Sequence, residues 1–356
     1  MDSHWVDIKI CMQNQHFFSC WIEQSLPSHV TVPDKLQLET LAGDAGFRRY
    51  FRVNTHPSLI AVDAPPEKEK NPAYVKLALF FQEQGLRTPK IYAVNYKQGY
   101  MLLEDFGLTL FCQRLEDENS AVLYDRAETA LLAIQNSTAD ELLLPKHDRL
   151  KLSEELALFE QWFLNKLLGY RLSYDEKVHL EVFFEHLIGS AKAQPQVLVH
   201  ADYHSRNLMI LDTEKLGIID FQDAMHGAIT YDLVSLLKDC YVHWSPDWVI
   251  QRALIFKQRL EAAGLLANHI DDKQFLQWFD LMGLQRHIKV LGIFARLALR
   301  DAKDTYLNDI PLVVHYCLEA SAQYPQTVQF NQWFKEKIVP LLAQQSWYCD
   351  YSDTQL

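Results

Sequence analysis

The sequence has little that would attract a nucleic acid, because acidic residues outnumber basic ones. It contains 46 Asp and Glu against 34 Lys and Arg in 356 residues, which gives a formal net charge of −12 at pH 7. Proteins that bind nucleic acids take much of their affinity from Lys and Arg contacts to phosphates, so this balance argues against that class. The negative charge allows a cationic small-molecule partner but does not require one.

Cysteine patterns that would mark a disulfide framework or a zinc site are also missing. The chain has no Cys-x-x-Cys pair and no combined Cys and His set at the spacing of a zinc site, so we expect free thiols in a reducing compartment. The six cysteines are Cys11, Cys20, Cys112, Cys240, Cys317 and Cys349.

Long apolar runs are absent as well. The first residues lack a basic region followed by an apolar stretch, so they do not predict a secretory signal. The apolar run at residues 290–299 is interrupted by Gly292 and Arg296 and is too short to span a bilayer. We therefore expect a cytoplasmic protein that has no membrane partner.

What the sequence does contain is enough apolar surface for a large folded protein in two lobes. Hydrophobic residues make up 49% of the chain, and its length exceeds that of one ordinary core. Residues 35–104 predict five short strands with one helix after the third strand, and helices dominate after residue 106. We expect a helical extension at 1–30, a β-rich lobe at 31–105 and a helical lobe at 106–356. Within the last lobe, short strands are expected at 197–199, 208–211 and 217–219.

The strongest signal for chemistry is a pair of loops that follow short apolar strands. Residues 199–208 read Val-His-Ala-Asp-Tyr-His-Ser-Arg-Asn-Leu, and residues 217–223 read Gly-Ile-Ile-Asp-Phe-Gln-Asp. They place Asp202, Asn207 and Asp220 where a rigid strand supports an exposed side chain. Phosphoryl transfer needs such a set, because one carboxylate accepts the proton of the attacking hydroxyl and two hard oxygen ligands hold Mg²⁺ against a triphosphate.

This order, His-x-Asp-x-x-x-x-Asn followed by Asp-Phe, resembles the catalytic and metal loops of protein-kinase-like enzymes. The His-Ala-Asp-Tyr-His form is similar to the aminoglycoside-phosphotransferase branch. The resemblance implies an α+β, protein-kinase-like bilobal fold, with a small mostly β N-terminal lobe, a larger mostly α C-terminal lobe, and ATP and Mg²⁺ as cofactors. It makes Asp202 the catalytic base, Asn207 and Asp220 metal ligands, and Asp232 a brace for the catalytic loop.

A metallohydrolase is a weaker interpretation of the same segment. His200 and His204 have a spacing that fits one face of a helix, but the segment is expected to be a loop and no third ligand is apparent.

The resemblance also predicts where the nucleotide binds. Glu104 and Phe106 end the small lobe, at the hinge whose backbone would contact adenine. Residues 41–47 would form the loop over the phosphates, with Gly43, Asp44 and Gly46, although a plain hairpin turn explains the glycines equally well. No Gly-Lys-Ser/Thr follows, so this is not a Walker motif.

One part of the protein-kinase-like family is missing. Its third strand usually carries a lysine that contacts the phosphates, but residues 59–64 here read Leu-Ile-Ala-Val-Asp-Ala. Arg48, Arg49, Arg52 and Lys68 are candidates to supply the charge, and we assign Arg49 to the nucleotide site. A solvated strand face for the arginines and a surface position for Lys68 remain open alternatives.

Several softer stretches resemble a more specific group. Residues 43–52 read Gly-Asp-Ala-Gly-Phe-Arg-Arg-Tyr-Phe-Arg and residues 62–68 read Val-Asp-Ala-Pro-Pro-Glu-Lys. Together with residues 220–227 and 285–296, they are similar to the anomeric sugar kinases that phosphorylate N-acetylmuramic acid and N-acetylglucosamine in cell-wall recycling. The resemblance covers residues 41–311 and leaves out the first thirty residues and the C-terminal helices.

A row of cations is the candidate for binding the acceptor. Arg286, Lys289, Arg296 and Arg300 recur at three- and four-residue steps, so they share one helix face. If this face lines the cleft, it suits an anionic sugar better than a cationic aminoglycoside; a solvated helix face is the alternative. Asp223 is a further candidate for contacting the substrate, or it caps its own loop.

The sequence thus predicts an ATP- and Mg²⁺-dependent phosphotransferase that acts on a sugar hydroxyl, as a monomer or small homo-oligomer. One rival is an enzyme of the same class that acts on an aminoglycoside, an amino alcohol or another small metabolite. The second rival is a non-catalytic nucleotide-binding protein with a kinase fold. The missing lysine favours this last possibility, whereas the presence of Asp202, Asn207 and Asp220 together disfavours it.

Overall fold

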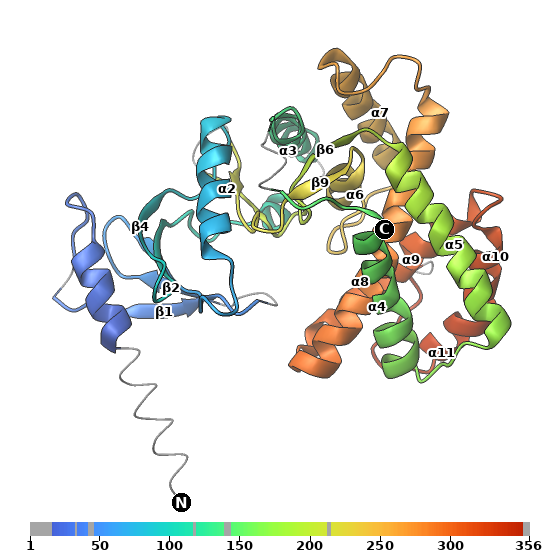
Figure 1. Cartoon of the computed structure of the whole chain (residues 1–356), viewed down its shortest axis with the longest axis horizontal. Helices are drawn as coiled ribbons and strands as arrows, with labels where there is room; N and C mark the ends of the chain where they lie inside the picture. The colour runs from blue at the N-terminus through green and yellow to red at the C-terminus, as the bar shows by residue number, and fades with distance from the viewer. Residues whose placement is uncertain are drawn as a thin grey trace, which may run out of the picture. The chain divides into compact units, whose positions relative to one another are not determined.

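The computed structural model describes residues 16–32, 34–41, 46–116, 119–138, 144–211 and 215–351. Two compact units make up the chain (Figure 1). Unit 1 comprises Met1–Thr109 and Met209–Gln222, and unit 2 comprises Leu110–Leu208 and Asp223–Leu356. The architecture is the α+β, protein-kinase-like bilobal fold that the sequence predicts, with the sheet in unit 1 and most helices in unit 2.

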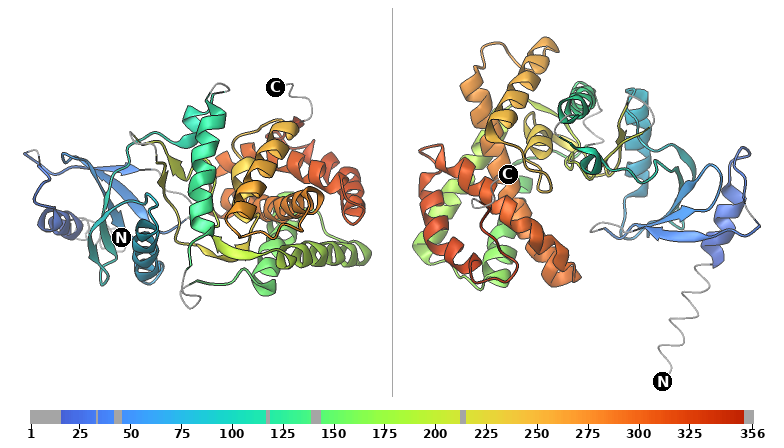
Figure 2. Two further views of the ribbon diagram at one scale, coloured as in Figure 1. Left: turned by 90° about the horizontal axis from the view of Figure 1, so that it is seen from above. Right: turned by 180° about the vertical axis from the view of Figure 1, so that it is seen from behind.

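Unit 1 is built on a five-stranded antiparallel sheet in the order β1-β2-β3-β5-β4. The predicted five strands with one inserted helix are confirmed, because α2 (Asn71–Glu83) follows the third strand. The strands are β1 (Leu38–Leu41), β2 (Arg49–Val53), β3 (Leu59–Asp63), β4 (Ile91–Asn95) and β5 (Tyr100–Glu104). In Figures 1 and 2, α2 and the helical residues 16–25 lie on opposite sides of this sheet.

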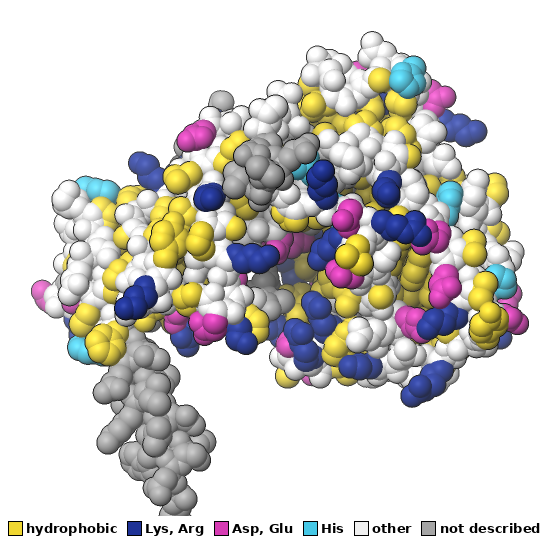
Figure 3. All heavy atoms as spheres, in the orientation of Figure 1, with side chains coloured by type: hydrophobic (Ala, Val, Ile, Leu, Met, Phe, Trp, Pro, Cys, Tyr) yellow, Lys and Arg dark blue, Asp and Glu magenta, His cyan; other side chains and the backbone are white. Residues whose placement is uncertain are grey.

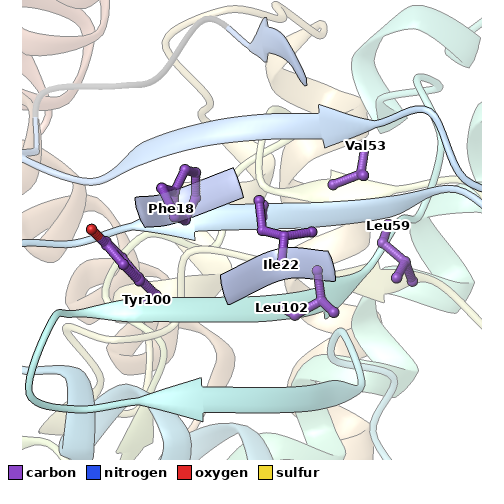
Figure 4. Packing of buried hydrophobic residues seen from close by; sticks show 7 residues of the cluster. Phe18, Ile22, Val53, Leu59, Tyr100 and Leu102 are labelled. Atoms are coloured by element: carbon purple, nitrogen blue, oxygen red, sulfur yellow. The ribbon is translucent and has the colours of Figure 1, made fainter. Parts of the chain in front are cut away.

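The helical residues 16–25 close one face of the sheet. Phe18 and Ile22 are four residues apart on one side of the helix and are buried, with Phe18 4% and Ile22 0% exposed. They pack against alternate residues of the strands, so this face is a continuous apolar core (Figure 4). The strand residues are Val53, Leu59, Ala61, Tyr100 and Leu102.

A later segment of the chain, residues 209–222, returns to unit 1 through backbone hydrogen bonds. The Ile210 N–H donates to the Thr109 carbonyl at 2.9 Å, and the Ile218 N–H donates to the Arg87 carbonyl at 2.8 Å. The second bond lies in β8 (Gly217–Ile218), which forms a two-stranded sheet with β7 (Leu208–Met209). A Cβ atom at Gly217 would lie only 2.6 Å from the Phe106 ring, so a glycine is required there.

Unit 2 is organised around α8 (Asp272–Asp301), which packs against α4, η2, α5, α6, α7, η3 and α9. These and the other helical elements are η1 (Phe111–Arg114), α3 (Ser120–Gln135), α4 (Arg149–Leu158), η2 (Phe159–Leu167), α5 (Tyr174–Ala193), α6 (Tyr231–Leu237), α7 (Pro246–Ala262), η3 (Asp304–Asp309), α9 (Ile310–Ala322), α10 (Val328–Trp333), η4 (Phe334–Ile338) and α11 (Val339–Leu342). Two antiparallel strands, β6 (Gln196–Val199) and β9 (Met225–Ala228), pair with each other, and the loop with Asp202 follows β6.

The close approach of α8 to α4 depends on Gly292. A Cβ atom at this position would lie 2.5 Å from the backbone carbon of Leu158, which is the last residue of α4. At this point α4 ends and the chain continues as the π-helical segment η2. Gly292 therefore has a packing role that its position in an apolar run did not reveal.

Among the residues that the structure describes, no helix combines the length and the apolar character that crossing a membrane requires.

The core contact of residues 16–25 yields a stability prediction. Phe18→Ala should lower the free energy of unfolding by about 3–5 kcal/mol, because it removes a buried ring and leaves a cavity against the sheet. The neighbouring Phe17 is 57% exposed, so Phe17→Ala is a matched control that should change it by no more than about 0.5 kcal/mol. Urea unfolding of the two variants measures the difference, and equal effects would mean that this helix does not stabilise unit 1.

Candidate active site

The backbone that carries Asp202 is held by the carboxylate of Asp232, which lies in the first turn of α6. Asp232 Oδ2 accepts the His200 N–H at 2.6 Å and Oδ1 accepts the Ala201 N–H at 3.1 Å. The side chain is fully buried, and burial raises the pKa of Asp232 to about 7, while the two N–H bonds act against that rise. This arrangement agrees with the bracing role that the family resemblance implied.

The clamp holds a backbone conformation that would otherwise be unfavourable. Ala201 has φ 78°, in the left-handed region, where a residue with a Cβ loses roughly 1–2 kcal/mol. Its turn ends β6 and brings Asp202 to a partly exposed position, with the Asp202 N–H donating to His200 Nδ1 at 3.3 Å. Asp232 thus stabilises the turn that presents the predicted base.

A second carboxylate fixes the other end of the loop. Asp239 accepts the Ser205 N–H at 2.9 Å and the Tyr241 N–H at 3.1 Å. Asn207 Nδ2 donates to the Asp202 carbonyl at 3.0 Å, so the amide oxygen of Asn207 points away from that carbonyl. Asp202 and Asn207, two of the three residues predicted to carry the chemistry, are therefore held in one rigid loop of unit 2.

Asp220, the third of these residues, lies in unit 1, just after β8. It adopts φ 63°, and Gln222 Nε2 donates to its Oδ1 at 2.6 Å. Phe221, the next residue, is fully buried; its ring stacks on Tyr74 at 4.9 Å and meets Phe81 edge-on at 5.7 Å, both in α2. Phe221 anchors this loop and leaves the Asp220 carboxylate partly exposed.

The predicted hinge residues are fixed by ion pairs within unit 1. Glu104 accepts two hydrogen bonds from Arg87 and a third from the Lys90 N–H at 3.1 Å. Burial favours the neutral acid, yet Arg87 and the Lys90 N–H hold the pKa of Glu104 below its usual value. The Arg87 guanidinium also lies over the Phe106 ring at 4.8 Å. Because these contacts occupy both side chains, only the backbone of Glu104 and Phe106 is available to contact a nucleotide base, as the predicted hinge requires.

Four residues are candidates to replace the charge of the missing lysine. Three of them, the arginines, form ion pairs with carboxylates and differ in how exposed they are. Arg49 pairs with Asp63 but is 62% exposed, and Arg52 binds Asp105 through two hydrogen bonds. Lys68 is exposed, and its ammonium lies 5.3 Å from the Phe47 ring.

Arg48 differs from the others, because its side chain is only 6% exposed and pairs with Glu69 at 3.1 Å. Its guanidinium lies 5.3 Å from the Tyr74 ring, and its Nε is buried without a hydrogen-bond partner. Burial raises the pKa of the Tyr74 hydroxyl; the Asp220 charge adds to that rise and the Arg48 charge opposes it. Glu69 also accepts the Phe47 N–H at 3.0 Å, directly beside Gly46. Gly43 and Asp44 lie outside the described residues.

The predicted basic face of α8 is not a uniform solvated surface. Arg286 is buried at 4% exposure, Lys289 and Arg296 are partly buried, and Arg300 is exposed and paired with Asp301. Figure 3 shows Lys and Arg side chains gathered near the C-terminal end of α8, which is the exposed end of this row.

Lys289 is committed to a buried polar network. Its ammonium pairs with Glu155 at 3.1 Å and donates to the Tyr231 hydroxyl at 3.0 Å. Glu155 also receives hydrogen bonds from His147 at 2.9 Å and Gln285 at 3.1 Å. Burial opposes the charged form of Lys289, but Tyr231 and Glu155 raise its pKa above the usual value. The network ties α8 to α4 and α6.

Arg286 is buried against the Cys240 thiol. Burial opposes its charge, but Cys240, Tyr231 and Asp202 raise the pKa of Arg286 above its usual value. Its Nη1 is buried without a hydrogen-bond partner. Arg286 and Asp202 thus lie in the same unit, and the Asp202 charge favours the charged form of Arg286. Asp223, which was also predicted to contact substrate, is exposed in the turn before β9.

Sequence reasoning missed two parts of this site. Asp239 clamps the loop as Asp232 does, but its only sequence signal is a carboxylate shortly after the end of α6. Arg206 lies inside the catalytic motif and was not singled out, although its position between Asp202 and Asn207 could have drawn notice. Among the described residues, no three His, Cys, Asp or Glu side chains gather as a metal-binding cluster.

Comparison with known proteins places this geometry in a family. A model described as the phosphotransferase enzyme family matches residues 37–267. The N-acetylmuramate/N-acetylglucosamine kinase of Pseudomonas aeruginosa is 37% identical, over 88% of this chain and 94% of that protein. The protein of the same name from Neisseria meningitidis serogroup B is 35% identical, over 88% and 93%.

A solved aminoglycoside phosphotransferase with bound ADP has a similar fold. Its TM-score is 0.54 at 14% identity, covering 81% of this chain and 95% of that one.

The Asp232 clamp yields a second prediction. Asp232→Ala should lower the free energy of unfolding by about 2–4 kcal/mol, because it leaves two buried N–H groups without acceptors, and should reduce turnover as the turn at Ala201 relaxes. Asp125 is a matched control: its carboxylate is 54% exposed in a surface ion pair with Arg259, so Asp125→Ala should cost less than about 1 kcal/mol. Equal denaturant midpoints for the two variants would show that the clamp does not hold the loop.

Proposed function

The chain belongs to the phosphotransferase enzyme family, and from that premise we propose that it transfers the γ-phosphoryl group of Mg²⁺-ATP to the anomeric hydroxyl of N-acetylmuramic acid or N-acetylglucosamine. The observation that carries this proposal is that two relatives named N-acetylmuramate/N-acetylglucosamine kinase are each at least 35% identical over 88% of the chain. The rigid loop that holds Asp202 supports the chemistry.

Asp202 is the proposed general base. It accepts the proton as the acceptor's O–H bond breaks, the oxygen bonds to phosphorus, and ADP leaves. An anomeric hydroxyl is more acidic than an ordinary alcohol, so a carboxylate suffices as its base. Most of the rate enhancement in this reaction comes from positioning and charge neutralisation. The hydrogen bonds from His200, Ala201 and Ser205 to buried carboxylates supply the rigidity that positioning needs.

Asn207 and Asp220 are the proposed metal ligands. Both offer hard oxygen atoms, which Mg²⁺ prefers, and one or two protein oxygens together with phosphates and waters are its usual set in nucleotide sites. Asn207 directs its amide nitrogen at the Asp202 carbonyl, which turns its oxygen the other way. Asp220 extends from a loop that Phe221 anchors. When bound, Mg²⁺ would neutralise charge on the phosphates.

We propose Arg48 as the cation that replaces the family's third-strand lysine. It is buried, oriented by Glu69, and close to Tyr74 and Asp220. A pairing of this kind holds a cation in place and leaves part of its donor set available, as the unpartnered Nε indicates. The exposed Arg49 and Lys68 lack such support. The hinge at Glu104 and Phe106 and the loop at Gly43, Asp44 and Gly46 complete the proposed nucleotide site.

For the acceptor, we propose that Arg286 balances charge beside Asp202, while Lys289 serves the network around Glu155. Arg296 and Asp223 remain candidates for contacts at the edge of the acceptor site. The proposed reaction consumes ATP and releases a sugar phosphate. Because it needs ATP, we propose that the protein acts in the cytoplasm. An aminoglycoside or amino alcohol would need carboxylates rather than cations around it, so the basic surroundings of Asp202 disfavour those acceptors.

The division of roles between Asp202 and Asp220 is testable with two variants. Asp202→Asn should reduce turnover by about a hundred- to ten-thousand-fold while nucleotide affinity stays near normal, because an amide cannot take the proton. Asp220→Ala should instead weaken nucleotide binding in the presence of Mg²⁺ and flatten its dependence on Mg²⁺ concentration. Calorimetric titration of ATP at several Mg²⁺ concentrations separates the two. If Asp220→Ala keeps the Mg²⁺ dependence of the unaltered protein, Asp220 is not a metal ligand.

The acceptor class is testable by a coupled ADP-release assay. N-acetylmuramic acid and N-acetylglucosamine should support turnover well above that of ethanolamine, choline and aminoglycosides, each measured at equal concentration. The Asp202→Asn variant is the control for phosphotransfer at this site. Good turnover of an aminoglycoside beside none of either sugar would refute the proposed substrate and leave the family assignment in place.

A further inference from the structure

Arg206 occupies an unusual place on the catalytic loop, between the proposed base Asp202 and the proposed metal ligand Asn207. It is exposed, and its guanidinium lies 3.5 Å from the centre of the Tyr241 ring. Within the part of the chain that the structure describes, Arg206 forms no ion pair or hydrogen bond. This cation of the loop therefore has no direct ion-pair partner among the described residues.

The stacked contact orients this cation without using its donors. A guanidinium that lies on an aromatic face presents its N–H groups at its edge, where they can bind a carboxylate or phosphate through two parallel hydrogen bonds. Tyr241 is itself fixed: its N–H donates to Asp239, its ring meets His204 edge-on at 5.4 Å, and it contacts Phe294 at 6.4 Å. The loop thus carries a preorganised fork for a planar anion.

The other cations near Asp202 are less suited to an incoming anion. Lys289 is neutralised by Glu155, and Arg286 is only 4% exposed. Both also lie close to Asp202, where the acceptor oxygen must go. In N-acetylmuramic acid the carboxylate is carried by a substituent on C3, two ring positions from the anomeric carbon, so it lies away from the reacting oxygen. Its partner should therefore lie along the loop from Asp202, as Arg206 does.

We propose that Arg206 binds the carboxylate of an acidic amino-sugar acceptor and so determines how strongly the enzyme prefers that sugar to its neutral counterpart. The inference rests on the proposed function, because it names a specificity residue for the same reaction. It places the binding of the acceptor's carboxylate on the catalytic loop and not on the cations of α8.

Asp309, at the end of η3, adds a polar group of opposite sign to the same region. It is partly buried and has no ion pair among the described residues. Burial raises the pKa of Asp309 to about 6, and Arg206 is the cation that acts against that rise. A carboxylate in this position accepts hydrogen bonds from sugar hydroxyl or amide N–H groups. Together, Arg206 and Asp309 match an acceptor that has both an anion and neutral donors.

The experiment compares kcat/KM for N-acetylmuramic acid and N-acetylglucosamine in the unaltered protein, in Arg206→Gln and Arg206→Lys, in Arg296→Gln as the rival site, and in one control variant. The ratio of acidic to neutral sugar should fall by about ten- to hundredfold in Arg206→Gln, the range for losing a charge-assisted bidentate pair. Arg206→Lys should recover only part of it, because an ammonium keeps the charge without the planar fork. Arg149→Gln, at an exposed arginine of α4 that pairs with Glu185, should leave the ratio unchanged.

Each remaining outcome counts against the inference. Equal losses on both sugars would place Arg206 at the transferring phosphoryl group, and an unchanged ratio would make it a solvated loop residue. A fall in the ratio for Arg296→Gln but not for Arg206→Gln would move the carboxylate to α8. If the unaltered protein turns over neither sugar, the proposed function fails and this inference fails with it; turnover of both sugars with an unaltered ratio refutes the inference alone.

Discussion

The constraint on which the catalytic loop depends is the pair of hydrogen bonds from the His200 and Ala201 N–H groups to the buried Asp232 carboxylate. A left-handed alanine is unfavourable, and a carboxylate without solvent is unfavourable, but each is stabilised by the other. The turn that results ends β6 and presents Asp202. Asp239 repeats the device at Ser205, so a loop of polar residues becomes as rigid as the elements that flank it.

Unit 1 uses ion pairs for a related purpose. Its arginines are each matched to a carboxylate, and each pair joins residues that are well separated in the sequence. The pairs are Arg48 with Glu69, Arg49 with Asp63, Arg52 with Asp105 and Arg87 with Glu104. The four pairs differ in how deeply they are buried. An exposed pair contributes little to stability, whereas a buried pair is costly to break and so holds its geometry. Arg48 is the most buried of these arginines, which is why we propose it as the substitute for the missing strand lysine.

Much of this arrangement could be predicted from the sequence because it follows local patterns. Alternating apolar residues predicted the five strands, and the spacing of Asp202, Asn207 and Asp220 predicted the chemistry. Long-range pairing could not be read in the same way. β9 has no alternating pattern, and residues 209–222 join unit 1 through hydrogen bonds to Thr109 and Arg87 and through the Phe221 ring, which are contacts between segments far apart in the sequence. The spacing of the α8 cations showed that they share a face, but it did not show that Lys289 is bound to Glu155. Nor did the sequence show that Arg206, on the loop after β6, has no ion-pair partner among the described residues.

Phosphorus and proton NMR of the product formed from N-acetylmuramic acid and ATP test the account most directly. The account predicts a phosphate whose phosphorus couples to the anomeric proton, formed by the unaltered protein and lost in Asp202→Asn. A phosphate on the 6-hydroxyl, or the same product at an undiminished rate from Asp202→Asn, would contradict it.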